Sequence, residues 1–415
     1  MNHLDLGLAV KNTPVVDPVP IPAGLLNKEF LPVDVAVGMS SAGGINMIIG
    51  NAKVFLDGKF VSGSVTVKNG MITAIGDEKT YDVDAKGQYL VPGFVDVHTH
   101  GAMGGDFSDG KAEDLEKMSR YYAANGVTSF LATTMTLKEH TLTPVMEVIR
   151  DFVRPQDGAK CAGIHLEGPF LCYNKRGAQA AENLHLPDAD MFDRLNQASG
   201  GNVRLVTVAP ETEGAMEFIR KVSPVCAVSL GHTEADYDTA MEAYKNGASH
   251  ATHLFNGMPA LHHRIPGVIA AAFDSGATVE LICDGLHIHP GVIRMASRLF
   301  GEKLVVISDS LRCAGMPDGQ YELGGQQIEI KNGKATLLGS DTLAGSSSNL
   351  LLELRNLVAF GLPLEDALAA MTIAPAKAAR LDKTIGSITI GKAADLLLLD
   401  EQLNLSAVYI DGQKL

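Results

Sequence analysis

The sequence has little positive charge. Its 415 residues include 34 lysines and arginines against 48 aspartates and glutamates, which gives a formal net charge of −14. No cluster of lysine and arginine interrupts this acidic balance, so the chain lacks the basic surface that follows nucleic-acid phosphates. We therefore expect no nucleic-acid partner.

Paired cysteines and long apolar runs are also missing. The five cysteines are scattered and show no Cys-x-x-Cys spacing, which predicts free thiols in a reducing compartment. No run approaches the roughly 18 apolar residues of a membrane span, and no basic segment leads into an apolar one at the N-terminus. We expect a cytoplasmic protein with no membrane partner and a large core, since 46% of its residues are hydrophobic.

The two ends of the chain differ in composition from its middle. Five of the 18 prolines precede residue 33 and a Ser-Ser-Ala-Gly-Gly stretch follows, which predicts a flexible extension or linker over residues 1–46. Short β-rich runs separated by Gly-containing turns come next, and similar runs close the chain. We expect residues 47–90 and 381–415 to form one small β-domain, with strands at 52–56, 64–68, 72–75, 387–389, 395–399 and 405–410.

The middle of the chain, residues 91–380, alternates apolar runs with amphipathic segments. Helices are predicted between most of the runs, for example over 112–125 and 234–246, and a glycine follows each of these two. This number of β/α units matches a TIM barrel, and a doubly wound open sheet is the alternative. The predicted strands are 90–97, 129–133, 163–166, 203–208, 226–230, 251–254, 278–283 and 303–308.

Polar residues with metal-binding or catalytic chemistry stand at the ends of these runs. In a barrel the carboxyl ends of the strands build the active site, so residues far apart in the sequence would converge there. The residues at or just beyond the strand ends are His98, His100, Glu167, His232, His253, His287 and Asp309.

The types of these residues predict a site for one or two divalent ions. His98 and His100 alternate on a strand and so project to the same side. Glu167 offers a carboxylate that can bridge two cations, and His232 and His253 offer neutral imidazoles to a second one. Such ligands suit Zn, Fe, Mn or Co, and the sequence does not choose among them.

Asp309 is the candidate for proton transfer. The apolar run before it delivers its carboxylate to the mouth of the barrel beside the predicted ions. A carboxylate there can take a proton from activated water and pass it to a leaving amine. The predicted reaction is hydrolysis of an amide-like bond.

Several motifs resemble those of a known family. The run Val-Pro-Gly-Phe-Val-Asp-Val-His-Thr-His-Gly at 91–101 resembles the signature of the amidohydrolase superfamily. Motifs at 165–169, 231–233, 253–258, 284–287 and 314–319 are similar to those of the N-acetylglucosamine-6-phosphate deacetylases. The resemblance implies a distorted TIM barrel with a β-sandwich formed by both chain ends. It also implies hydrolysis of N-acetylglucosamine 6-phosphate to glucosamine 6-phosphate and acetate, in amino-sugar catabolism.

The resemblance also assigns roles to individual residues. Glu167, His232 and His253 match the main metal site, and His98 and His100 match the second site of two-metal members. Asp309 matches the catalytic acid/base, which also contacts metal. Arg264 matches an arginine that reaches the phosphate in the neighbouring subunit, which implies a functional homodimer. Further positions that match substrate contacts are Ala178, Gln179, Asn256, Gly257, His287, Leu343, Ala344 and Gly345.

Gln179 departs from the family pattern. Many members carry a histidine here that polarises the acetamide carbonyl, whereas glutamine can donate a hydrogen bond but offers no positive charge. With two ions, one of them could polarise the carbonyl instead. Our hypothesis is that Gln179 and the intact His98/His100 pair are linked features.

Three other functions compete with this interpretation. N-acetylgalactosamine-6-phosphate deacetylase suits the same motifs, because the two sugars differ at one hydroxyl. A dihydroorotase or hydantoinase would carry a lysine on the fourth strand, and residues 203–208 contain none. A non-catalytic phosphosugar-binding homologue is expected to have lost ligands, whereas all six are present here.

Overall fold

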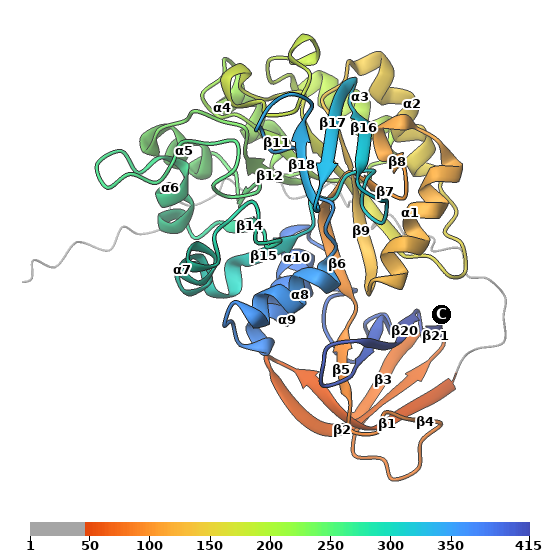
Figure 1. Ribbon diagram of the computed structural model, residues 1–415. Helices are drawn as coiled ribbons and strands as arrows, with labels where there is room; N and C mark the ends of the chain where they lie inside the picture. Colours follow the sequence, from red (N-terminus) through yellow and green to blue (C-terminus); the bar gives the residue numbers. More distant parts are fainter. Residues whose placement is uncertain (1–45) are drawn as a thin grey trace, which may run out of the picture. The chain divides into compact units, whose positions relative to one another are not determined.

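A computed structural model describes residues 46–415 of the chain (Figure 1). The extension predicted over 1–46 lies outside the described residues apart from Asn46, which opens the first strand. Among residues 46–415, no helix is both long and apolar enough to cross a membrane.

The middle of the chain forms a parallel barrel. Its strands are hydrogen-bonded in chain order, from β6 to β15. The barrel closes where the backbone N–H of Asp309 donates to the carbonyl of His98 at 2.9 Å, and that of His100 to the carbonyl of Ser310 at 2.8 Å. This closure confirms the barrel and excludes the open sheet. The strands are β6 (Phe94–Thr99), β9 (Val127–Thr134), β10 (Lys160–Glu167), β11 (Val203–Val208), β12 (Ala227–Leu230), β13 (His250–Ala251), β14 (Thr278–Ile282) and β15 (Leu304–Ile307).

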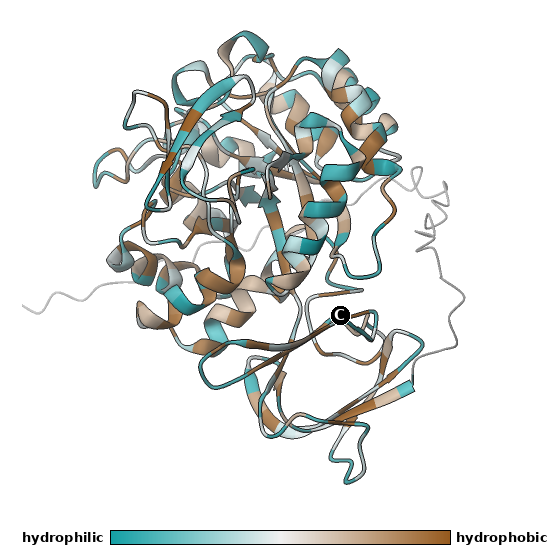
Figure 2. Ribbon diagram, turned by 45° about the vertical axis from the view of Figure 1, so that its right-hand side comes forward, coloured by the Kyte–Doolittle hydropathy of each residue, from teal (hydrophilic) through white to brown (hydrophobic). Residues whose placement is uncertain are grey.

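Amphipathic helices connect the strands, and hydrophobic and hydrophilic residues alternate along them (Figure 2). Helix α1 ends before Gly126, which has a positive φ of 80°, as predicted. Helix α5 begins three residues later than predicted, because the side chain of Asp236 caps it by accepting from the N–H of Thr239. The helices are α1 (Ala112–Ala124), α2 (Glu139–Arg150), α3 (Ala189–Ala198), α4 (Ala215–Val222), α5 (Tyr237–Lys245), α6 (Gly267–Ser275), α7 (Pro290–Phe300), α8 (Leu350–Ala359), α9 (Leu364–Met371) and α10 (Ile373–Ala378).

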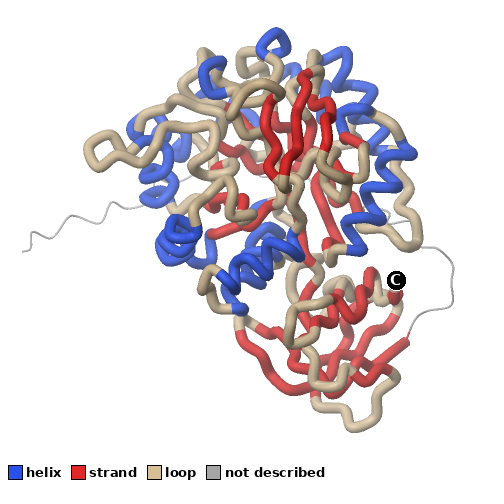
Figure 3. The backbone as a smooth tube through the Cα atoms, in the orientation of Figure 1, coloured by secondary structure: helices blue, strands red, loops and turns tan. Residues whose placement is uncertain are grey.

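Strands from both ends of the described chain form one mixed sheet. Strand β19 pairs antiparallel with β5, with Leu398 opposite Leu90, and so joins the C-terminal strands to the N-terminal ones. Apolar side chains from both groups, such as Val54 and Leu396, share one buried cluster. Figure 3 shows this part of the chain as strands and loops. The strands are β1 (Asn46–Leu56), β2 (Lys59–Lys68), β3 (Met71–Gly76), β4 (Val83–Asp84), β5 (Tyr89–Pro92), β19 (Leu396–Leu399), β20 (Leu405–Ile410) and β21 (Gln413–Lys414).

Three predicted strands differ from the structure. The run 90–97 is divided between β5 and β6, because Gly93 donates its N–H to the carbonyl of Asp395 at 2.9 Å as the chain passes from one sheet to the other. Residues 387–389 form no strand, since the Ser387 hydroxyl bonds to Lys392 and Thr389. The run 251–254 is a strand only over His250–Ala251 and then turns.

Two small sheets were not anticipated from the sequence. β7 (Gly101–Ala102) pairs with β8 (Gly105–Asp106), and a three-stranded sheet consists of β16 (Gly319–Leu323), β17 (Gln326–Lys331) and β18 (Lys334–Leu337). The side chain of Gln326 on β17 donates to the carbonyl of Ala178, in the loop after β10. The three-stranded sheet therefore supports a loop that carries predicted site residues.

A half-buried ion cluster joins β10 to the C-terminal strands. The ammonium of Lys160 donates to Asp395 and to Asp411, both at 2.9 Å. The Asp395 side chain is 4% exposed. Burial raises the pKa of Asp395, and the nearby Lys160 opposes that rise.

Replacing Lys160 with methionine should destabilise the fold. The change leaves the buried Asp395 carboxylate without its cation, and removing one partner of a buried pair costs about 3 kcal/mol in free energy of unfolding. Urea unfolding would measure the difference. The control is Lys117→Met, which breaks the pair between the exposed Lys117 and Asp114 and should leave the free energy of unfolding nearly unchanged. Equal stability of the two variants would contradict the role of the cluster.

Candidate functional site

The structure brings the six predicted metal-site residues together at the carboxyl ends of the barrel strands. All six are buried, with exposed fractions between 0% and 8%. His98 lies in β6 and His100 directly follows that strand. The other four stand at the end of β10 or two residues beyond β12, β13 and β15: Glu167, His232, His253 and Asp309.

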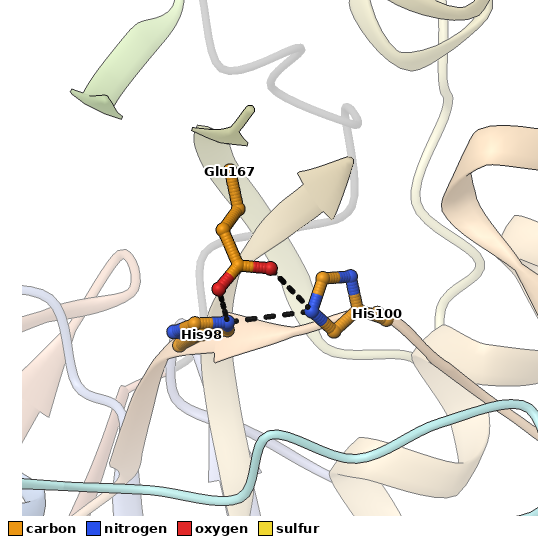
Figure 4. Close-up of side chains that lie close together, drawn as sticks. All are labelled: His98, His100 and Glu167. Atoms are coloured by element: carbon orange, nitrogen blue, oxygen red, sulfur yellow. Dashed lines mark hydrogen bonds and ion pairs between the residues drawn. The ribbon is translucent and has the colours of Figure 1, made fainter. Parts of the chain in front are cut away.

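The Glu167 carboxylate lies at the centre of this cluster. Figure 4 shows it facing the imidazoles of His98 and His100, with Oε1 3.3 Å from His98 Nε2 and Oε2 3.1 Å from His100 Nε2. The same Oε1 lies 3.2 Å from His232 Nε2 and 3.1 Å from His253 Nε2. One carboxylate is thus shared by two pairs of histidines.

Asp309 completes the cluster on the side of His98 and His100. Its Oδ1 lies 3.4 Å from His100 Nε2 and 3.6 Å from His98 Nε2. Backbone bonds hold it on both sides, since its N–H donates to the His98 carbonyl and its own carbonyl accepts from the N–H of Ser346 at 2.7 Å. The carboxylate is therefore fixed beside the histidine pair.

Three of these residues have strained backbones. The φ values of His232, His253 and Asp309 are 47°, 27° and 46°. They lie in the left-handed region of the backbone, which residues other than glycine rarely adopt. Such conformations cost on the order of 1–3 kcal/mol each and cluster at functional sites. The turn that follows each strand aims the side chain into the cluster.

The donor set fits divalent cations. Two groups, His98/His100/Glu167 and Glu167/His232/His253, each have their donor atoms within 4.8 Å of one another. The Nε2 atoms of His98 and His100 are 3.3 Å apart, and those of His232 and His253 are 3.0 Å apart. Two nitrogens bound to a tetrahedral Zn²⁺ at ~2.1 Å lie about 3.4 Å from each other. Imidazoles that face one another this closely suit a shared cation.

The charges of the cluster are strongly coupled. Burial alone would lower the pKa of His98, but Glu167, Glu280 and Asp309 raise it well above its usual range. For His100, Asp309 and Glu167 likewise outweigh burial and raise the pKa to about 9. Burial would raise the pKa of Glu167, yet the histidines hold it well below its usual range. A cation that binds here must therefore displace protons.

Two groups that sequence reasoning missed contact the Nδ1 atoms of ligand histidines. Glu280 on β14 lies 2.9 Å from His98 Nδ1, and the carbonyl of Lys175 lies 2.7 Å from His232 Nδ1. Burial would raise the pKa of Glu280, but His98 and His250 hold it well below its usual range. A glutamate inside the apolar run 278–283 is a sequence signal for a buried charge that needs a partner. A backbone carbonyl gives no such signal in the sequence.

Gln179 is bound at both ends of its amide. Its Nε2 donates to Glu167 Oε2 at 2.8 Å, and its Oε1 accepts from the N–H of Thr136 at 2.8 Å. The side chain is buried, and it orients the central carboxylate. Its expected contact with the substrate carbonyl stays a prediction.

His165 is not available as a metal ligand. Its Nδ1 lies 3.2 Å from the carbonyl of Val97, and its Nε2 lies 2.8 Å from the hydroxyl of Thr207. Both ring nitrogens are therefore engaged, although the ring lies close to His98 and Glu280.

Several predicted substrate-contacting residues lie beside the cluster. A Cβ on Gly257 would approach His232 Nδ1 at 3.1 Å, and one on Gly345 would approach the carbonyl of Asp309 at 2.8 Å. Leu343 and Ala344 directly precede Gly345 in the same loop. Within the described residues, the amide nitrogen of Asn256 is buried and has no hydrogen-bond partner. The two glycines thus let the backbone pass close to the cluster, and Asn256 has a donor available to a ligand.

The remaining predicted residues have other surroundings. His287 Nδ1 lies 2.8 Å from Asp284 Oδ2; burial would lower the pKa of His287, but Asp284 raises it. The carbonyl of Ala178 accepts from Gln326. Arg264 lies in an exposed turn, where its guanidinium lies 2.7 Å from His263 Nε2. Arg264 makes no hydrogen bond to the cluster within the described part of the chain.

Known proteins resemble this chain in both sequence and fold. Residues 89–415 match the model of the Amidohydrolase family. The N-acetylglucosamine-6-phosphate deacetylase of Bacillus subtilis is 36% identical over 85% of this chain and 92% of its own length. The N-acetylgalactosamine-6-phosphate deacetylase of Escherichia coli O157:H7 is 33% identical over 84% of this chain and 93% of its own.

A solved structure agrees with these relatives. A variant of N-acetyl-D-glucosamine-6-phosphate deacetylase from Mycobacterium smegmatis, in complex with N-acetyl-D-glucosamine-6-phosphate, superposes with a TM-score of 0.84. The two sequences are 33% identical, and the match covers 89% of this chain and 99% of the other chain. The family match, the identities and the common fold agree with the motifs that first suggested this resemblance. The chain belongs to the amidohydrolase family, within the group of N-acetylglucosamine-6-phosphate deacetylases.

Proposed function

We propose that the chain hydrolyses the acetamido group of N-acetylglucosamine 6-phosphate to glucosamine 6-phosphate and acetate. The observation that carries the proposal is the intact cluster in which Glu167 is shared by four histidines and Asp309 stands beside two of them. The names of the relatives support the substrate.

The proposed mechanism assigns the chemistry to the cluster and to Asp309. The six residues hold one or two divalent ions, of which Zn, Fe, Mn and Co are candidates, and a bound ion supplies Lewis acidity toward water and a carbonyl. Asp309 places a carboxylate 3.4 Å from His100 and 3.6 Å from His98, where it can accept a proton from the attacking water. The same group then returns the proton to the leaving amine.

The substrate is held by groups around the cluster. Asn256 and His287 offer side-chain donors to the sugar and its phosphate, while Gly257 and the 343–345 loop contact the sugar ring. Ala178 and Gln179, in the loop after β10, are further proposed contacts of the substrate. The raised pKa of His287 beside Asp284 favours a protonated imidazole, which suits an anionic substrate.

We further propose that the enzyme is a cytoplasmic homodimer in which Arg264 reaches the substrate phosphate of the partner subunit. The side chain lies in an exposed turn flanked by Leu261 and Ile265, which are 45% and 67% exposed. Apolar residues around an exposed guanidinium suit a surface that another copy covers. All five cysteines are free, which supports a reducing compartment.

The function is tested by acetate release from N-acetylglucosamine 6-phosphate and from its galactosamine epimer, in parallel. We expect turnover that is lost on chelation and restored by added metal, because the cluster needs a cation. The ratio of kcat/KM for the two sugars decides between the two deacetylases. Bound metal without turnover of either sugar would contradict the proposed substrate.

Replacing Asp309 with asparagine tests the proton-transfer role. The amide keeps the size of the side chain but cannot accept the proton, so turnover should fall by about 10²–10⁴. Metal content, measured by elemental analysis, should be largely retained, because Glu167 and the four histidines remain. Near-normal turnover by Asp309→Asn would contradict the assignment.

Mixing two inactive variants tests the dimer. Arg264→Ala and Asp309→Asn should each have low activity alone. A mixed dimer would contain one site with Asp309 intact and with Arg264 of the partner subunit, so about a quarter of wild-type activity should return after subunit exchange. Mixed dimers that form, as detected by differently tagged subunits, but stay inactive would show that Arg264 does not act across an interface.

A further inference from the structure

Glu280 is a buried carboxylate beneath the metal cluster. It lies in β14 (Thr278–Ile282) and has an exposed fraction of 0%. A carboxylate in such a place is costly unless both of its oxygens have donors. Its Oε1 lies 2.9 Å from His250 Nε2, and its Oε2 serves two further donors.

These two donors belong to different halves of the cluster. Glu280 Oε2 lies 2.9 Å from the Nδ1 of His98 and accepts the backbone N–H of His253 at 3.1 Å. His98 is a member of the group that includes His100, and His253 is a member of the group that includes His232. Glu167 is a member of both groups, and Glu280 holds one histidine of each.

Each bond has a specific consequence for the ligand it holds. A carboxylate accepts the proton on Nδ1 of His98, so that Nε2 is the ring nitrogen that gives up its proton to a cation and offers it a lone pair. The bond to the N–H of His253 lies at the residue whose φ is 27°. It stabilises the strained turn that carries this second imidazole into the cluster.

The other ligand histidines are held differently. The Nδ1 atoms of His100 and His253 are buried without a partner among residues 46–415, and that of His232 faces a loop carbonyl. Within that range, His98 is the ligand whose ring is held by a buried side chain of the barrel itself.

We propose that Glu280 is a positioning residue that fixes the two halves of the metal cluster relative to each other, and so sets the affinity of the site for its ions. The inference rests on the proposed function only in requiring that the cluster binds metal. It does not depend on which sugar is hydrolysed.

The test is titration of metal-free protein with Zn²⁺ by calorimetry, together with metal content after dialysis. Glu280→Gln keeps the shape and a neutral acceptor, so the affinity should fall about 10-fold, and Glu280→Leu, which has no acceptor, should approach a 100-fold loss. Matched controls are Glu353→Gln and Glu353→Leu. Glu353 is equally buried but accepts the backbone N–H of Cys283 and bonds to none of the ligands.

A double-mutant cycle separates positioning from general damage to the fold. In a His98→Ala background, Glu280→Gln should weaken Zn²⁺ binding less than about threefold, because the imidazole it held is gone and glutamine keeps an acceptor for the N–H of His253. The visible spectrum of the Co²⁺-substituted protein should change in Glu280→Gln and stay as in the wild type in Glu353→Gln.

Two results would overturn the proposal. One is wild-type Zn²⁺ affinity in folded Glu280→Gln, and the other is an equal loss with and without His98. If the leucine variant does not fold, the glutamine variant still decides. A wild-type protein that binds Zn²⁺ but releases no acetate would refute the proposed function and leave the assignment of Glu280 standing.

Discussion

Glu167 places one buried carboxylate within 3.3 Å of four imidazole nitrogens, and the arrangement of the site follows from that contact. Four histidines from three segments can face one point only if negative charge or a cation stands between them. The supporting bonds serve this arrangement, because Gln179 orients the carboxylate while Glu280 and the carbonyl of Lys175 orient two of the rings. The site is thus a neutralising network in which each ligand depends on the others.

Much of this could be predicted from the sequence, because the barrel ties position along a strand to position in space. All eight apolar runs of the middle segment contribute a barrel strand, and six of the seven polar residues at or beyond their ends meet in one cluster, whereas His287 pairs with Asp284. His98 and His100 illustrate the reason, since alternation on one strand is a local property that needs no knowledge of the rest of the chain. The pairing of both chain ends in one sheet followed in the same way from their similar turn patterns.

What could not be predicted depends on contacts between distant segments. The break at Gly93, for example, is set by the carbonyl of Asp395, some 300 residues away. The sequence marks Gln179 as unusual but does not show that its amide would turn to Glu167. A buried charge such as Glu280 can be noticed in an apolar run, whereas its partners are known only once β14 lies beside the cluster.

The seam of the barrel runs through the active site. The N–H of Asp309 bonds to the carbonyl of His98, so two residues of the cluster also join the last strand region to the first. An opening of the barrel at this seam would separate the proton-transferring carboxylate from the histidine it faces. Opening of the barrel at this seam and loss of the catalytic geometry are therefore one event, whereas motion of a loop that does not carry the seam leaves both intact.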